Sequence, residues 1–378
     1  MEHYIIKIEP LTVLHIGTGR TVEPHEYTVY NTNNNPLYLR INYENIFERI
    51  TDEKLMKKLI KELSTTNDFI RFRSILQEES GEFFTKNFIY GSHVTGEFVK
   101  EFKEKYSDPN NQLAILENYR PPFSKVPFIP GSSIKGAIRT ALLNKYAKNV
   151  DRAKLPNLRK LAEYSRRNDN SFQQALLNYH SAKEDPFRTI HISDGKVTGK
   201  RQMIVGIAYN FSLKNGIPRD STIPIYLEAI RGMAADGDAS TKVTVRLQSE
   251  LVATSRILNK EMFNGIPFKI DKGEIITDCN TFYKKAWEFE FENFYLNNPD
   301  TTNFGLWERL NSDIKEIGTN HNEFLLRIGR FSHMEAVTIE EFRKPPKGYG
   351  KSRTLFSYKD MLLPIGWVKA TIEEPEDE

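Results

Sequence analysis

The chain has 378 residues, of which 39% are hydrophobic and 27% are charged, a balance that supports a folded core and excludes wholesale disorder. The 53 Lys and Arg residues barely exceed the 50 Asp and Glu residues, so any nucleic-acid function must depend on where the cations lie. The single cysteine, Cys279, excludes an internal disulfide and a zinc site built from cysteines, and it fits a cytoplasmic location. The sequence has no apolar run of about 20 residues and no signal-peptide pattern, so we expect no membrane-spanning helix and no secretion.

Apolar spacing along the chain predicts strands at both ends and helices between them. Proline and glycine clusters, such as the one at 121–131, mark the breaks between these elements. The expected elements, in chain order, are a strand over 4–16, a hairpin over 26–41, helices over 43–63, 133–148 and 156–180, strands over 189–193, 203–211, 222–229 and 242–247, an aromatic-rich helix over 280–297, and strands over 324–328 and 365–372.

This order of elements predicts an α+β fold, because strands and helices do not alternate as they do in a doubly wound sheet. We expect an N-terminal region over 1–195 with a helical insertion over about 43–117. A C-terminal region with basic loops is expected over 196–370, followed by a disordered acidic tail over 371–378.

Cations gather in segments that contain no acidic residue, namely 118–150, 195–219 and 342–359. Such segregation is typical of a phosphate-binding track on a protein of nearly neutral charge. The alternative is that these cations pair through space with acids from other segments. Aromatic residues within 342–359 could stack on bases or fill the core beneath the loops.

The segment 128–143 has the strongest physical logic for anion binding. A Pro-Gly turn followed by two serines predicts a capped helix whose N–H groups and dipole face outward. Gly136 lacks a side chain, so a ligand could approach the backbone there. The alternative is a capped core helix with two solvated cations. These cations are Lys135, in the first turn of the helix, and Arg139, one turn later on the same face.

The sequence Pro-Gly-Ser-Ser-Ile-Lys-Gly over 130–136 closely resembles the signature of the RAMP superfamily of CRISPR-associated RNA-binding proteins. Further segments resemble the same family, and together they are most similar to the fifth subunit of the type III-A (Csm) effector complex. These segments are 14–19, 326–331, 350–354 and 363–368.

The resemblance implies a ferredoxin-like (RRM-like) RAMP core with helical insertions. It implies a non-catalytic RNA-binding subunit that caps the filament at the 3′ end of the CRISPR RNA (crRNA) and contributes to its maturation in antiviral defence. The implied partners are crRNA, the backbone and small subunits of the Csm complex, and a recruited host nuclease, with no cofactor, metal or membrane. The expected RNA contacts are Gly17, Gly19, Arg20, Gly131, Ser132, Ser133, Lys135, Arg139, Arg201, Arg327, Arg330, Lys351 and Arg353.

Two alternatives remain open at this stage. Some RAMP relatives cleave RNA without a metal, which would make this chain a guide-processing endoribonuclease with His15 as general acid or base. The chain could instead be a protein–protein cap that meets RNA only through its neighbours. We expect Asp194 to be a turn residue, and because the loop after Gly329 is not glycine-dense, we expect side-chain contacts there from Arg330 and Phe331.

Overall fold

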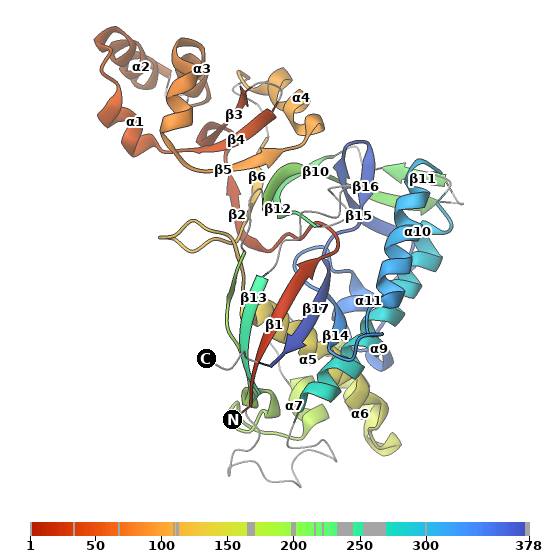
Figure 1. Ribbon diagram of the computed structural model, residues 1–378. Helices are drawn as coiled ribbons and strands as arrows, with labels where there is room; N and C mark the ends of the chain where they lie inside the picture. Colours follow the sequence, from red (N-terminus) through yellow and green to blue (C-terminus); the bar gives the residue numbers. More distant parts are fainter. Residues whose placement is uncertain are drawn as a thin grey trace.

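A five-stranded antiparallel sheet forms the base of the molecule and joins strands from both ends of the chain (Figure 1). The computed structural model describes residues 2–32, 35–66, 69–108, 110, 113–164, 171–197, 202–214, 217–220, 223–232, 245–251, 270–298 and 301–374. The strand order in this sheet is β14 (Glu323–Arg327), β17 (Trp367–Glu373), β1 (Glu2–Pro10), β13 (Val245–Leu251) and β8 (Ile190–Ile192). Helices α5 (Gly131–Lys148) and α9 (Lys272–Glu290) cover one face and share its apolar core.

A second, ten-stranded sheet curves away from the first. Its main path is β2 (Gly17–Val22), β6 (Ile115–Asn118), β12 (Ile225–Ile230), β10 (Met203–Lys214), β5 (Phe88–Val94), β4 (Asn35–Ile41) and β3 (Tyr27–Thr32). Off this path, β11 (Ile217–Asp220) and β15 (Ser352–Tyr358) pair with β10, and β16 (Met361–Leu363) pairs with β15. A short pair, β7 (Phe128–Ile129) and β9 (Gly195–Lys196), leads into α5.

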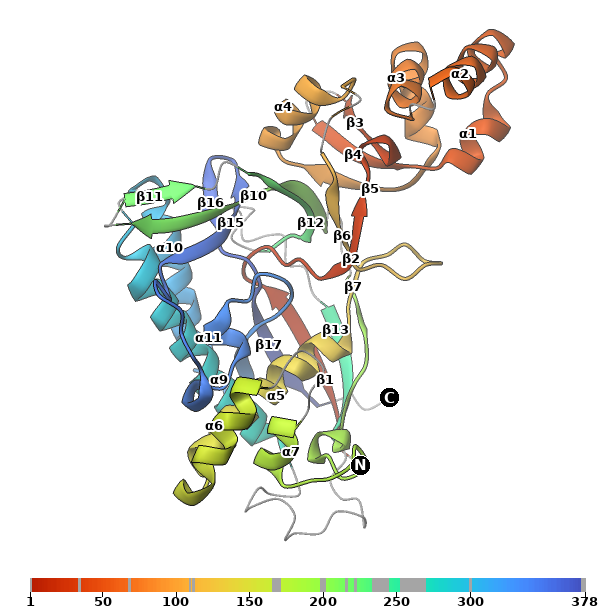
Figure 2. The same ribbon diagram turned by 180° about the vertical axis from the view of Figure 1, so that it is seen from behind.

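The remaining helices surround these sheets (Figures 1 and 2). A helical lobe stands at the far end of the second sheet, and its core includes Leu59, Phe72 and Phe84. Its helices are α1 (Tyr43–Arg49), α2 (Glu53–Thr66) and α3 (Phe69–Lys86), and the others are α4 (Gly96–Lys105), α6 (Leu155–Tyr164), α7 (Ser171–Leu177), α10 (Thr301–Glu316) and α11 (Met334–Val337). No helix in the described ranges is long and apolar enough to cross a membrane.

The α+β class and the ferredoxin-like core are confirmed, but the predicted insertion over 43–117 is only partly helical. Helices α1, α2 and α3 end at Lys86, and β5 and β6, which flank α4, then enter the second sheet. Both pair in parallel with strands from the other half of the chain, β5 with β10 and β6 with β12. Strand pairing over such sequence distances leaves no local pattern, so the sequence could not reveal it.

The predicted division at residue 195 does not separate two sheets, because each sheet combines strands from both sides of it. The expected basic loop over 342–359 contains β15, whose residues Arg353–Tyr358 are buried between β10 and β16. Helix α10 was not predicted, although its buried Trp307, Leu310 and Ile314 have helical spacing. The predicted disordered tail is wrong for 371–373, which belong to β17, whereas 375–378 lie outside the described residues.

The start of α5 is packed tightly against the end of β8. A Cβ atom added at Gly131 would lie 2.1 Å from the carbonyl oxygen of Ile192, so no larger residue fits without moving the backbone. One turn later, a Cβ atom added at Gly136 would meet nothing within 4 Å. Packing therefore requires glycine at position 131 of this helix but not at position 136.

We expect Gly131→Ala to lower the free energy of unfolding by about 1–3 kcal/mol through overpacking. Gly136→Ala should raise it by up to about 1 kcal/mol, because alanine favours a helix interior over glycine. Urea unfolding of the two variants and the wild type measures both effects. Equal shifts of the two variants would contradict the packing difference.

Candidate nucleic-acid interface

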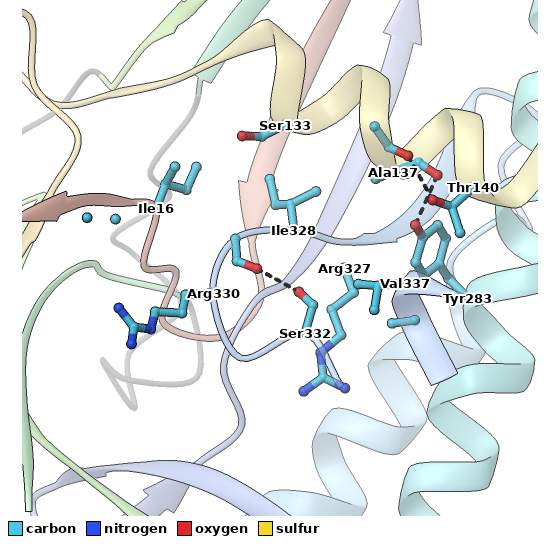
Figure 3. A pocket seen from close by; sticks show the side chains of 15 residues that line it. Ile16, Ser133, Ala137, Thr140, Tyr283, Arg327, Ile328, Arg330, Ser332 and Val337 are labelled. Carbon is cyan, nitrogen blue, oxygen red and sulfur yellow. Dashed lines mark hydrogen bonds between the residues drawn. The ribbon is translucent and has the colours of Figure 1, made fainter. Parts of the chain in front are cut away.

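A groove of about 500 Å³ opens where three segments distant in the sequence meet (Figure 3). These are the start of β2, the first turns of α5 and the loop that follows β14. The backbone N–H of Arg330 donates to the carbonyl oxygen of His15 at 2.9 Å, which fixes the third segment against the first. The predicted contact residues that line this groove are Gly17, Gly19, Ser133, Arg327 and Arg330, and Gly136, Thr140, Gly329 and Ser332 line it with them.

Glycines that line this groove leave its backbone accessible to a ligand. A Cβ atom at Gly19, where φ is +82°, or at Gly136 would meet nothing within 4 Å, so both positions open onto free space. A glycine inside a helix lowers its stability by about 1 kcal/mol relative to alanine, and no packing in the described residues requires one at Gly136. The exposed side chain of Arg330 adds positive charge at the same groove. This surface suits a ribose–phosphate strand that must approach the protein backbone closely.

Lys135 and Arg139 lie on another face of α5 and are not among the residues that line this groove. Lys135 Nζ donates to the carbonyl oxygen of Ile190 at 2.7 Å. Arg139 forms an ion pair with Asp185 at 2.8 Å, and its guanidinium lies 4.4 Å from the ring centroid of Phe187. At 100° per residue, positions 135 and 139 point away from the face that carries 133, 136 and 140.

The predicted serine cap of α5 is also wrong. The N-cap residue is Pro130, and the N–H of Gly131 donates to the carboxylate of Asp194 at 2.8 Å. Asp194 is thus more than the predicted turn residue, since it supplies the anion that the helix N-terminus favours. Ser132 is exposed and is not among the residues that line the groove, whereas Ser133 lines it. The helix terminus itself is therefore not a free phosphate site.

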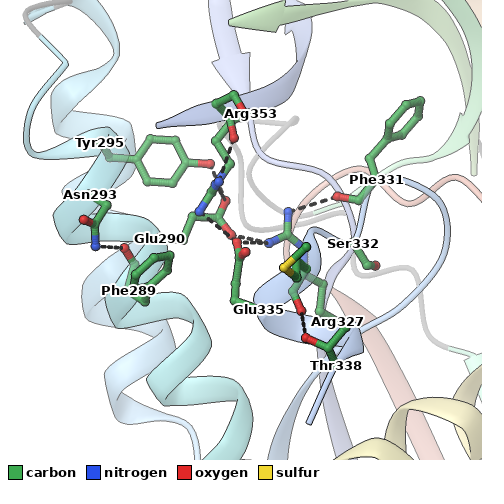
Figure 4. A network of polar contacts seen from close by, with 12 residues as sticks. Phe289, Glu290, Asn293, Tyr295, Arg327, Phe331, Ser332, Glu335, Thr338 and Arg353 are labelled. Atoms are coloured by element: carbon green, nitrogen blue, oxygen red, sulfur yellow. Dashed lines mark hydrogen bonds and ion pairs between the residues drawn. The ribbon is translucent and has the colours of Figure 1, made fainter. Parts of the chain in front are cut away.

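Arg327 and Arg353 are buried, with 2% and 3% of their surfaces exposed, although Arg327 is among the residues that line the groove. Both pair with the buried Glu290, and Arg353 also pairs with Glu335 at 2.8 Å (Figure 4). Burial alone would raise the pKa of Glu290, but the two arginines outweigh it and hold the carboxyl pKa below its usual value. Arg327 also donates to the carbonyl oxygen of Phe331 at 3.3 Å. This network therefore positions the loop that carries Arg330.

The other predicted contacts have different positions. Arg20 and Lys351 are exposed but do not line the groove, and Arg201 lies outside the described residues. Many cations of the acid-free segments pair with acids from distant segments, as the alternative interpretation held. These pairs are Arg120–Glu228, Arg139–Asp185, Lys145–Asp278, Lys148–Glu340 and Lys344–Glu163.

The aromatic residues of 342–359 are mainly structural rather than free stacking platforms. Phe356 and Tyr358 are buried in the core of the second sheet. Tyr349 stacks on Phe289 with the ring centroids 4.6 Å apart, and Phe342 meets Phe172 edge to face. These rings therefore fill space beneath the loops.

His15, the candidate general acid or base, is fully buried and is not among the residues that line the groove. Its Nδ1 lies 2.6 Å from the carbonyl oxygen of Glu228 and donates to it. Burial lowers the pKa of His15 to about 4, and this effect outweighs the hydrogen bond, which raises it. Within the described ranges, no group of three or more His, Cys, Asp or Glu residues could hold a metal ion.

Loss of the Glu290 charge should strongly destabilise the fold. Glu290→Gln keeps the side-chain size but leaves two buried arginines short of negative charge, so we expect the free energy of unfolding to fall by about 3–5 kcal/mol. Glu341→Gln is the matched control, because Glu341 pairs with Arg159 at the exposed surface and should change stability by less than about 0.5 kcal/mol. Similar chemical unfolding curves for both variants would contradict a supporting role for the network.

The buried neutral His15 also predicts a pH dependence of stability. The unfolded state binds a proton at this histidine below pH 6.5, whereas the folded state binds it only near pH 4, so stability falls as the pH falls between these values. We expect His15→Gln to remove about 1.4 kcal/mol per pH unit from the slope of unfolding free energy between pH 6 and 4.5. Parallel pH profiles of the variant and the wild type would refute this.

Comparison with known proteins identifies the family of this chain. The RAMP superfamily matches residues 7–332. The CRISPR system Cms protein Csm5 of Streptococcus thermophilus is 26% identical over 240 residues, which are 61% of this chain and 61% of that protein. The chain therefore matches somewhat less than two thirds of the length of this curated relative.

Solved structures share the fold over nearly the whole chain. A chain in the cryo-EM structure of a Csm–crRNA–target RNA ternary complex of a type III-A CRISPR-Cas system has a TM-score of 0.66 and 19% identity, covering 98% of this chain and 100% of that one. The crystal structure of T. onnurineus Csm5 has a TM-score of 0.60 and 18% identity, covering 96% of this chain and 99% of that one. With a family match over most of its length and this shared fold, the chain belongs to the RAMP superfamily.

Proposed function

We propose that this chain is an RNA-binding subunit of a type III-A CRISPR (Csm) complex and that it holds crRNA in the groove beside α5. The observation that carries the proposal is the meeting of three family-like segments at one glycine-lined surface, where Gly19 and Gly136 lie open and Arg330 is exposed. The similarity to Csm5 of Streptococcus thermophilus supports the type of complex.

The mechanism of binding is based on charge and shape. Arg330 pairs with a phosphate, while the hydroxyl groups of Ser133 and Ser332 are available to phosphate oxygens or ribose 2′-hydroxyls. The open glycines allow the strand to contact backbone N–H groups directly. None of these contacts reads the edge of a base, so affinity at this groove should not depend on the guide sequence.

The finer parts of the proposal concern the place of the chain in the complex. We place it at the 3′ end of crRNA as a cap on the filament, next to RAMP backbone subunits and the small subunits, where it contributes to guide maturation with a recruited nuclease. We propose that the chain itself is non-catalytic, which the burial of His15 supports. Isolation of the chain from its host, followed by identification of bound RNA and proteins, tests this placement.

Two pairs of variants test the groove directly. Arg330→Glu should weaken binding of single-stranded RNA about tenfold and reduce the slope of log affinity against log salt by about one. Lys315→Glu makes the same charge change at an exposed position of α10 and should have little effect. Gly136→Leu should block the groove, whereas Gly305→Leu changes a glycine of α10 that is equally open and should leave RNA affinity unchanged.

Circular dichroism of all four variants checks that the fold is retained. RNA affinity that is equal for Arg330→Glu and Lys315→Glu, and for Gly136→Leu and Gly305→Leu, would refute RNA binding at this groove. Tight binding that arises only in the assembled complex and is insensitive to these changes would instead favour a cap that meets RNA through neighbouring subunits.

A further inference from the structure

A second groove of about 450 Å³ lies in the upper sheet and shares no lining residue with the first. Its walls are β4, β5, the start of β10 and the loop between β6 and β7, which projects from the body of the molecule (Figures 1 and 2). Leu39, Phe88 and Met203 provide an apolar wall. The loop is framed by prolines and closed by a hydrogen bond from the Lys125 N–H to the carbonyl oxygen of Pro121 at 3.1 Å.

Several buried polar atoms of the residues that line this groove lack a hydrogen-bond partner among the described residues. The Ser92 hydroxyl, in a residue that is 5% exposed, has no hydrogen-bond partner among the residues that the structure describes, and the same holds for Arg120 Nε. A buried donor or acceptor without a partner costs about 1–3 kcal/mol. A ligand that bonds to these groups would recover that free energy, so the groove has the chemistry of a binding site.

Arg120 is held rigidly at the groove. Its guanidinium lies 3.4 Å from the buried carboxylate of Glu228 and 4.0 Å from the ring centroid of Tyr90. Burial alone would lower the pKa of Arg120, but Glu228 outweighs it, and the side chain remains charged. Because arginine offers only donors, the ligand group next to it must be an acceptor.

The charge of the groove favours an anion over a neutral peptide. None of the 13 lining residues is acidic, whereas Arg120 and Lys125 are cationic, and the Lys125 side chain is exposed at the mouth. An apolar wall, buried donors and a cation at the mouth together match a nucleotide, with its flat base, carbonyl oxygens and phosphate.

We propose that this second groove binds one unstacked nucleotide of single-stranded RNA. The base lies against Phe88 and Met203, its carbonyl oxygens accept from Ser92 and Arg120, and its phosphate pairs with Lys125. Uracil, cytosine and guanine present carbonyl oxygens to donors, whereas adenine has none, so the groove disfavours adenine. Sequence preference therefore resides in this groove and not beside α5.

The first test measures binding of short oligouridine and oligoadenosine to the full chain. Lys125→Glu should weaken oligouridine binding about threefold to tenfold and lower the salt slope by about one, whereas Lys103→Glu, the same change at an exposed position of α4, should not. Ser92→Ala removes a buried hydroxyl without a partner, so stability should be unchanged or higher while the preference for uridine falls about fivefold. A variant that binds less well yet unfolds no more easily excludes misfolding as the cause.

Photo-crosslinking of oligouridine that contains 4-thiouridine locates the site. We expect crosslinks within Phe88–Val94 or at Met203, and they should persist in the Gly136→Leu background, where the groove beside α5 is blocked. That background separates the two proposals, since either groove can fail without the other. An absence of crosslinks there, equal behaviour of Lys125→Glu and Lys103→Glu, or capture of a peptide from another subunit in place of RNA would overturn the proposal.

Discussion

The structure depends on a buried set of opposite charges that holds together four segments in the C-terminal third of the chain. Glu290 on α9 and Glu335 on α11 compensate Arg327 from β14 and Arg353 from β15, all in the protein interior. Buried charges are tolerated only when each has a partner, so these four residues must come together for the fold to close. The loop after β14 leaves this network and meets the segment between β1 and β2 that contains His15, which completes the groove beside α5.

This arrangement separates cations that build the protein from cations that can bind a ligand. Arg120, Arg139, Arg327 and Arg353 pair with carboxylates of the same chain, whereas Arg330 and Lys125 are exposed at grooves. Exposed cations contribute to RNA affinity in proportion to the phosphates they contact, so a few well-placed side chains suffice for salt-dependent binding. The open backbone at Gly19 and Gly136 adds contacts that carry no charge. A nearly neutral protein can therefore hold a polyanion.

The two grooves would divide the recognition of RNA between them. The groove beside α5 offers backbone, hydroxyl groups and one exposed arginine, which suit the repeating ribose–phosphate chain. The second groove, whose walls include β5, offers an apolar wall and buried donors, which suit a base. Their separate linings mean that affinity and base preference can be altered independently by substitution.

The sequence alone determined the fold class, the position of α5 and the resemblance to the RAMP superfamily, because helix periodicity and the Pro-Gly-Ser-Ser-Ile-Lys-Gly motif are local properties of the chain. It also identified Gly17, Gly19, Ser133 and Arg330, which the fold brings to one groove. Only the tertiary structure decided which face of α5 is open, since Lys135 and Arg139 find their partners in Ile190 and Asp185, far away in the sequence. Burial of His15, the pairing of Arg327 and Arg353, and the groove beside β5 likewise arise from contacts between distant segments, and a linear pattern of charge and apolarity does not specify which distant side chains meet.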